Sequence, residues 1–126
     1  MNPLKLVLVA TIGALLAACA AAIPDTARPF TAAELHSYLS GYTEVWSEGA
    51  GYYAEDGTFV AVWEGEPAEG TWTTSDEGKL CWHSEAWGET PCSTYLFDGD
   101  SIIIIYEGET SPENERYEGN VVDNYM

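Results

Sequence analysis

The chain has 126 residues, of which 21 are acidic and only 4 are lysine or arginine, so its formal net charge at pH 7 is −17. A surface this negative repels nucleic acid and anionic lipid headgroups, which argues against direct binding to either. The part beyond the apolar start has the length of one small domain. Such a domain buries a limited fraction of its surface, so a disulfide would matter to its stability.

The first predicted element is an export signal. Lys5 precedes an apolar run from Leu6 to Ile23, which contains the sequence Leu16-Ala17-Ala18-Cys19. A basic start, an apolar segment and small residues before a possible cleavage site are typical of signal peptides. The four residues ending at Cys19 also resemble the lipobox of bacterial lipoproteins, in which cleavage directly precedes a lipid-modified Cys. We therefore predict a lipoprotein-type signal peptide over residues 1–18 and lipidation at Cys19.

Two other interpretations of this segment remain open. A transmembrane helix needs roughly 20 consecutive apolar residues, and the run has nearly that length but contains Thr11 and Gly13. An ordinary secretory signal, cut in the Ala-rich tract around Cys19, would give a soluble periplasmic or secreted protein. Under the lipobox interpretation, more than one acyl chain anchors the protein stably to a membrane. Ala20 is not the Asp that commonly retains enteric lipoproteins at the inner membrane, so we expect an outer-membrane lipoprotein that faces the periplasm.

Residues 19–30 are predicted to be a spacer, because Pro24 and Pro29 lie in a stretch with little apolar pattern. The single domain is expected over residues 31–126, with its core in residues 40–107. Thr31-Ala32-Ala33-Glu34 has the pattern of a capping box, in which the Thr and Glu side chains satisfy each other's backbone donors. It predicts a short helix from Ala32 to Leu39, ended by Ser40-Gly41.

Beyond the helix, short β-type segments alternate with turn residues such as Asp56-Gly57 and Asp98-Gly99. This order predicts a mainly β fold, an antiparallel meander that forms a small barrel or a lipocalin-like half-barrel with the helix against it. The tail beyond Glu107 either adds one edge strand or stays loose. The expected strands are Tyr42–Trp46, Gly51–Ala54, Thr58–Trp63, Gly70–Thr74, Leu80–Ser84, Cys92–Phe97 and Ser101–Tyr106.

The run Ile102-Ile103-Ile104-Ile105 is expected to be a strand covered on both faces, with acidic flanks such as Asp100 and Glu107 that oppose aggregation. The alternative is an edge that binds a partner.

Cys81 and Cys92 remain as a pair once Cys19 is assigned to the lipid, and an exported protein favours a disulfide. The midpoint between them falls inside the turn-like segment Glu85 to Pro91. Symmetric pairing of a hairpin would place the two residues directly opposite each other, within reach of a disulfide. We predict a structural Cys81–Cys92 bond worth roughly 2 to 3 kcal/mol, with two free thiols as the alternative. Redox catalysis is disfavoured because the chain has no Cys-x-x-Cys spacing.

Several turn and core elements follow one another in a characteristic order. They are Leu39-Ser40-Gly41, Tyr52-Tyr53-Ala54-Glu55-Asp56-Gly57-Thr58, Glu69-Gly70-Thr71-Trp72, Leu80-Cys81-Trp82 and Cys92. With these elements the chain resembles, over roughly Leu35 to Tyr106, a group of small exported proteobacterial proteins known as domain of unknown function 995. The resemblance implies a β-rich exported domain with no established activity, and it supplies no catalytic residues.

No cofactor or metal site is predicted. His83 is the only obvious further ligand near the cysteine pair, which disfavours zinc. The acidic turns Glu55-Asp56-Gly57 and Asp98-Gly99-Asp100 are too short for an EF-hand loop. We interpret the acidity mainly as a solvated surface.

No catalytic residues are predicted either. Nucleophilic catalysis needs a base oriented by a third group, and His36 and His83 are the only histidines. Carboxylates occur in nearly every turn, so none is singled out as an acid/base pair. We therefore predict a non-enzymatic envelope protein that binds a small apolar or amphipathic ligand or an envelope partner protein. The alternative is a small carboxylate-dependent hydrolase with Glu85 or His83 as conceivable members; the oligomeric state is left open.

Overall fold

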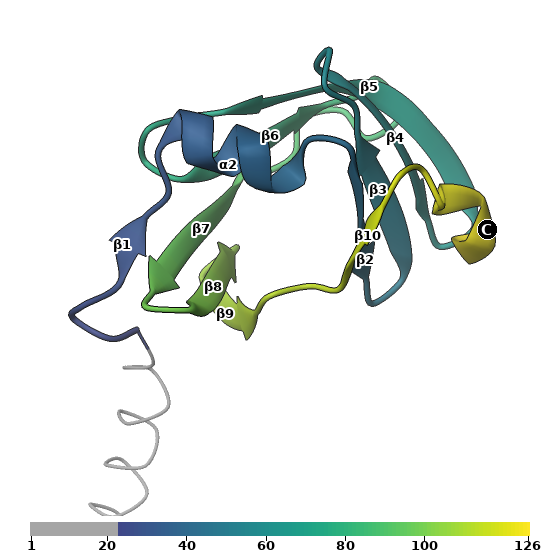
Figure 1. The fold of residues 1–126 in the computed structure, drawn as a ribbon. Helices are drawn as coiled ribbons and strands as arrows, with labels where there is room; N and C mark the ends of the chain where they lie inside the picture. Colours follow the sequence, from purple (N-terminus) through teal and green to yellow (C-terminus); the bar gives the residue numbers. More distant parts are fainter. Residues whose placement is uncertain (1–22) are drawn as a thin grey trace, which may run out of the picture.

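The computed structural model describes residues 23–126, so the predicted signal peptide and Cys19 lie outside the described residues. The sheet is an antiparallel meander in the order β10-β2-β3-β4-β5-β6-β7-β8-β9, and β1 pairs with β7 off this path. Figure 1 shows this meander curled into a half-barrel, which confirms the predicted fold class. The elements are β1 (Arg28–Pro29), α2 (Ala32–Leu39), β2 (Tyr42–Trp46), β3 (Gly49–Tyr53), β4 (Thr58–Trp63), β5 (Glu66–Thr74), β6 (Lys79–His83), β7 (Ser93–Asp98), β8 (Ser101–Tyr106), β9 (Glu109–Pro112), β10 (Arg116–Glu118) and the 3-10 helix η1 (Val122–Tyr125).

The helix has the predicted bounds, and its capping box is present. The Thr31 hydroxyl accepts a hydrogen bond from the Glu34 N–H at 3.1 Å, and the Glu34 carboxylate accepts one from the Thr31 N–H at 2.9 Å. Leu35 and Leu39, four residues apart, share one face of the helix and are fully buried. This face holds α2 against β5 and β2, across one end of the half-barrel (Figure 1).

Three predicted strands, now β2, β4 and β8, have the expected bounds, whereas β3 and β5 begin earlier than expected. Both early segments contain or adjoin glycine, which weakens a strand signal in the sequence. β3 and β5 pair with the two edges of β4, and this pairing determines their length instead. Gly49 also needs to be glycine for packing, because a Cβ there would lie 1.9 Å from the carbonyl oxygen of Val62.

The fold begins before residue 31, so the expected spacer of residues 19–30 is too long at its C-terminal end. Arg28 and Pro29 pair with Phe97 and Leu96 of β7, and Phe30 belongs to the core. The reason is the short contact between β6 and β7, which covers only two residue pairs. The far end of β7 therefore keeps a free edge, and β1 occupies it.

The tail beyond Glu107 forms two strands, which is more structure than either the single edge strand or the loose segment that we expected. β9 extends the sheet beside β8, and β10 returns to pair with β2 at the opposite edge. Residues 113–115 thus span the open side of the half-barrel between the two edges. Tyr38 of α2 ties this segment to the helix by donating a hydrogen bond to Glu113 at 2.5 Å.

The isoleucine run forms β8, but the expectation that both its faces are covered is wrong. Ile104 is 4% exposed and belongs to the core, whereas Ile103 and Ile105 are only half-buried. Successive side chains of a strand point to opposite faces, and the outer face of an open half-barrel borders solvent. Within residues 23–126, no helix has the length and apolar character required to cross a membrane.

Candidate functional site: an aromatic cleft beside a buried carboxylate

Side chains on the inner face of the half-barrel line a cleft of about 660 Å³. Alternate residues of each strand point inward, so β2 contributes Glu44 and Trp46 while β7 contributes Ser93 and Tyr95. Six of the fourteen lining residues are aromatic, and four of these are tryptophans. The lining consists of Glu44, Trp46, Ser47, Trp63, Trp82, Trp87, Thr90, Ser93, Tyr95, Ile104, Tyr106, Glu107, Ser111 and Asn114.

Trp46 is the centre of the aromatic wall. Its ring centroid lies 6.2 Å from those of Trp63, Trp82 and Trp87, and all three pairs have the tilted or edge-to-face geometry that aromatic pairs prefer. Gly51 on the neighbouring strand makes room for this ring, since a Cβ there would lie 2.6 Å from Trp46 Cη2. The wall therefore depends on a small residue at that position as well as on the tryptophans themselves.

Glu44 is fully buried at the back of this cleft, with 0% of its surface exposed. Its Oε1 accepts hydrogen bonds from Trp46 Nε1 at 3.0 Å and from the Tyr53 hydroxyl at 3.1 Å. Its Oε2 accepts one from the Tyr95 hydroxyl at 2.5 Å. Trp82 Nε1 extends the network by donating to the Tyr53 oxygen at 3.0 Å. A buried carboxylate is costly unless it is hydrogen-bonded, and these aromatic donors meet that requirement.

The donors that the structure describes on Glu44 are all uncharged. Arg116 of β10 lies directly opposite Glu44 in the strand register. Its guanidinium donates to the backbone carbonyl of Tyr38 at 2.6 Å and lies over the rings of Tyr38 and Tyr42, with Cζ 3.8 and 4.5 Å from their centroids. The nearby cation is therefore engaged mainly with carbonyl and aromatic groups.

Two tyrosines in this network have strongly perturbed acidity. Burial, followed by the negative charge of Glu44, raises the pKa of Tyr53 and the pKa of Tyr95 well above their ordinary range. Burial and the hydrogen bond to Glu113 also raise the pKa of Tyr38. All three phenols therefore remain protonated donors near neutral pH, which is the form that their hydrogen bonds to carboxylates require.

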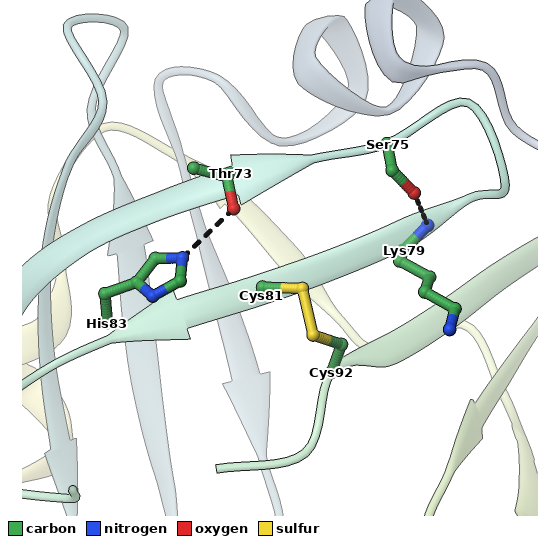
Figure 2. Close-up of a disulfide and its surroundings, with 6 residues drawn as sticks. All are labelled: Thr73, Ser75, Lys79, Cys81, His83 and Cys92. Atoms are coloured by element: carbon green, nitrogen blue, oxygen red, sulfur yellow. Dashed lines mark hydrogen bonds between the residues drawn. A yellow bond between two sulfur atoms is a disulfide. The ribbon is translucent and has the colours of Figure 1, made fainter. Parts of the chain in front are cut away.

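The structure contains the predicted Cys81–Cys92 disulfide, with Cα atoms 4.4 Å apart (Figure 2). The pairs Lys79 with Thr94 and Leu80 with Ser93 continue directly to Cys81 opposite Cys92, which is the symmetric register expected from the sequence. The bond ties together the base of the loop that carries Trp87 and Thr90 to the cleft wall. The disulfide thus supports the site although its sulfur atoms do not line it.

The structure places the other sequence candidates away from this cleft. His83 is exposed, and its Nε2 lies 3.2 Å from Thr73 Oγ1 on the adjacent strand (Figure 2). Glu85 is also exposed, and both residues line a second, outer groove with part of η1. His36 is exposed on α2, where its ring stacks on Trp72 with centroids 4.8 Å apart. None of these three residues lines the aromatic cleft.

The acidic turns considered for calcium connect strands. Residues 55–57 lie between β3 and β4, and residues 98–100 lie at the turn from β7 to β8. The Asp56 carboxylate accepts hydrogen bonds from the hydroxyl and N–H of Thr58, which lower its pKa. Within the part of the chain that the structure describes, no group of three or more His, Cys, Asp or Glu side chains is arranged to hold a metal ion.

Glu44 was not among the site residues predicted from the sequence, because one carboxylate among 21 carries no distinguishing motif. One signal was available. In Tyr42-Thr43-Glu44-Val45-Trp46, the carboxylate lies between two aromatic residues on the same face of a predicted strand. If the aromatic residues of such a strand face inward, Glu44 faces inward with them.

Fold and site together define a class: a small antiparallel β half-barrel with an aromatic cleft and a buried carboxylate behind its wall. The family described as "Protein of unknown function (DUF995)" matches residues 6–107 of the chain, and the chain belongs to this family. The match includes α2, strands β2 to β8 and most of the cleft lining. Comparison with curated proteins and with solved structures gave no significant match.

Proposed function

We propose that this domain is a non-enzymatic binding protein of the bacterial envelope that takes a small apolar or amphipathic molecule into its aromatic cleft. The observation that carries this proposal is the cleft itself. Its volume of about 660 Å³ lies within the several hundred Å³ typical of small-molecule sites. Trp46, Trp82 and Trp87 supply apolar surface, and hydroxyl groups such as that of Ser93 offer a few polar contacts.

The proposed location follows from the sequence. Lipidation at Cys19 would hold the domain at the outer membrane, facing the periplasm. The domain itself, with three basic residues against 21 acidic ones beyond residue 22, would not approach an anionic membrane unaided. The acyl chains would supply that attachment.

A dye titration tests the ligand-binding role. N-phenyl-1-naphthylamine is a neutral apolar dye whose fluorescence rises when it leaves water. We expect saturable binding by the wild-type domain and a loss of binding in Ser111→Trp. Ser111 is exposed on β9 and lines the cleft, so an indole there fills the space without disturbing buried packing.

Thr110→Trp is the matched control. Thr110 is the neighbouring residue of the same edge strand, is also exposed, and faces away from the cleft. Equal dye binding by both variants, or no saturable binding by the wild type, would rule out the cleft as a ligand site and leave the partner-binding role. Turnover of nitrophenyl esters or glycosides that Ser111→Trp abolishes would replace this proposal by the hydrolase alternative.

A further inference from the structure

We infer that the cleft selects an organic cation, an ammonium group carried on an apolar body, over neutral and anionic molecules of the same shape. This inference rests on the proposed ligand-binding function and names the class of its ligand. It depends on the aromatic wall, on the buried carboxylate behind that wall and on the charge of the cleft lining.

The aromatic wall offers the surface that an ammonium group prefers. The face of an aromatic ring carries negative charge density, and tryptophan attracts cations more strongly than the other aromatic residues. Four tryptophans line the cleft, and the three around Trp46 lie within 6.2 Å of it. Trp63 and Tyr106 are each 37% exposed, so the aromatic surface also reaches solvent.

Glu44 adds a full negative charge directly behind this wall. Because the residue is 0% exposed, a ligand would feel its charge through the aromatic side chains rather than touch the carboxylate. Coulomb attraction is several-fold stronger in a partly desolvated protein site than in water. The described donors to Glu44 are neutral indole and phenol groups, so they satisfy its hydrogen bonds without cancelling its charge.

The charged residues in the cleft lining are all negative. Glu44 and Glu107 are the charged residues in its lining, and no lysine or arginine is among them. Residues 23–126 hold 3 basic and 21 acidic side chains, a formal charge of 3 − 21 = −18. A cleft within such a domain concentrates cations and repels anions. Binding of a fatty-acid carboxylate, which an apolar cleft alone would accept, is therefore disfavoured.

Three small molecules with the same branched head test the inference directly. Choline carries a trimethylammonium group, 3,3-dimethyl-1-butanol replaces the nitrogen by carbon and is neutral, and 3,3-dimethylbutyrate is the corresponding anion. Binding is followed by tryptophan fluorescence and by displacement of the neutral dye, at low ionic strength. We expect choline to bind about tenfold more tightly than the neutral alcohol, and the anion more weakly than either.

Two variants, each of which removes one negative charge, show whether the preference for choline over the alcohol comes from Glu44. Glu44→Gln keeps the size of the side chain and its ability to join hydrogen bonds, so we expect the ratio of choline to alcohol affinity to fall about fivefold or more. Glu77→Gln removes an exposed carboxylate from the turn between β5 and β6, outside the cleft lining, and should leave the ratio unchanged. If Glu44→Gln does not fold, Trp87→Leu provides the second test, because it removes a ring face and should lower the same ratio.

The outcomes separate this inference from the proposed function. Dye binding by the wild type without any preference for choline over the alcohol would overturn the inference and leave the ligand-binding role intact. A preference that Glu77→Gln reduces as much as Glu44→Gln would also overturn it, since the effect would then come from overall charge. Failure of the dye itself to bind would reject the proposed function and the inference together.

Discussion

Tyr95 donates a 2.5 Å hydrogen bond to Oε2 of Glu44, joining β7 to β2 across the inside of the half-barrel between residues 51 positions apart. Both side chains are essentially inaccessible to solvent. The contact therefore connects the stability of the fold with the charge that lies behind the cleft.

Removal of this hydroxyl should destabilise the domain. In Tyr95→Phe, Oε2 of Glu44 loses the donor that the structure describes for it, and an unsatisfied buried acceptor costs about 1–3 kcal/mol. Urea unfolding with the disulfide intact measures the difference in the free energy of unfolding. Tyr52→Phe is the control, because Tyr52 is only half-buried on β3. This substitution should lower the free energy of unfolding by less than about 0.5 kcal/mol. Equal effects of the two changes would contradict the assigned role of the hydrogen bond.

Stability should fall as the pH rises above about 10, the ordinary pKa of tyrosine. The folded-state pKa values of Tyr53 and Tyr95 are raised, so the unfolded chain releases their protons at a lower pH than the folded protein does. Their contribution is fully present below pH 10 and is lost as the pH increases beyond it, by up to about 1.4 kcal/mol per pH unit for each group. Unfolding free energies measured from pH 8 upward should show this slope.

The double variant with Tyr53→Phe and Tyr95→Phe gives the control for that slope. The free energy of unfolding of this variant should retain only the weaker pH dependence that the other tyrosines cause. Absorbance at 295 nm reports phenolate directly, and a folded wild-type protein in which all eight tyrosines ionise together near pH 10 would disprove the buried environment of these two.

Loss of the Cys81–Cys92 bond should affect both stability and the cleft. The bond closes a short loop, with a sequence separation of 11, and such a closure contributes roughly 2–3 kcal/mol. In Cys81→Ser/Cys92→Ser, the loop that carries Trp87 is no longer tied at its base. Relative to the wild type, amide hydrogen exchange should accelerate more in residues 82–91 than in β4. The affinity for the dye should decrease. Unchanged exchange in that loop would show that the disulfide does not support the cleft wall.

A methyl group at Gly51 should disturb the aromatic wall. The added Cβ would lie 2.6 Å from Trp46 Cη2 and 2.7 Å from Phe59 Cε1, which forces at least one ring to move. We expect Gly51→Ala to destabilise the domain by about 1–3 kcal/mol and to weaken dye binding. Phe59→Leu, which replaces one of the two rings by a shorter aliphatic side chain, should relieve part of that cost when the changes are combined. Strictly additive effects in this double-mutant cycle would refute the proposed contact.

The anchor proposal has its own test in the producing bacterium. Cys19→Ser should abolish incorporation of a radiolabelled fatty acid and release the protein into the soluble periplasmic fraction. The intact mass of wild-type protein purified from membranes reports cleavage, acylation and disulfide state together. Absence of label on the wild-type protein would disprove lipidation, and an intact mass that retains residues 1–18 would favour the transmembrane alternative.

Several features of this domain were predictable because they depend on neighbouring residues in the chain. The capping box from Thr31 to Glu34 determines where α2 begins, and short β-type segments between turns such as Asp56-Gly57 determine the meander. The disulfide register was also predictable, because a symmetric hairpin places Cys81 opposite Cys92 whatever the curvature of the sheet.

Other features depend on contacts between distant parts of the chain, which no local pattern encodes. Curvature of the sheet brings Trp46, Trp82 and Trp87 around one cleft, and it buries Glu44 while leaving most other carboxylates in solvent. The pairing of β1 with β7, and of β10 with β2, likewise depends on which sheet edges remain free after the meander forms. The sequence by itself therefore determined the helix, the order of the seven central strands β2 to β8 and the covalent link, whereas tertiary packing decided which of 21 similar acidic residues lies behind the cleft wall.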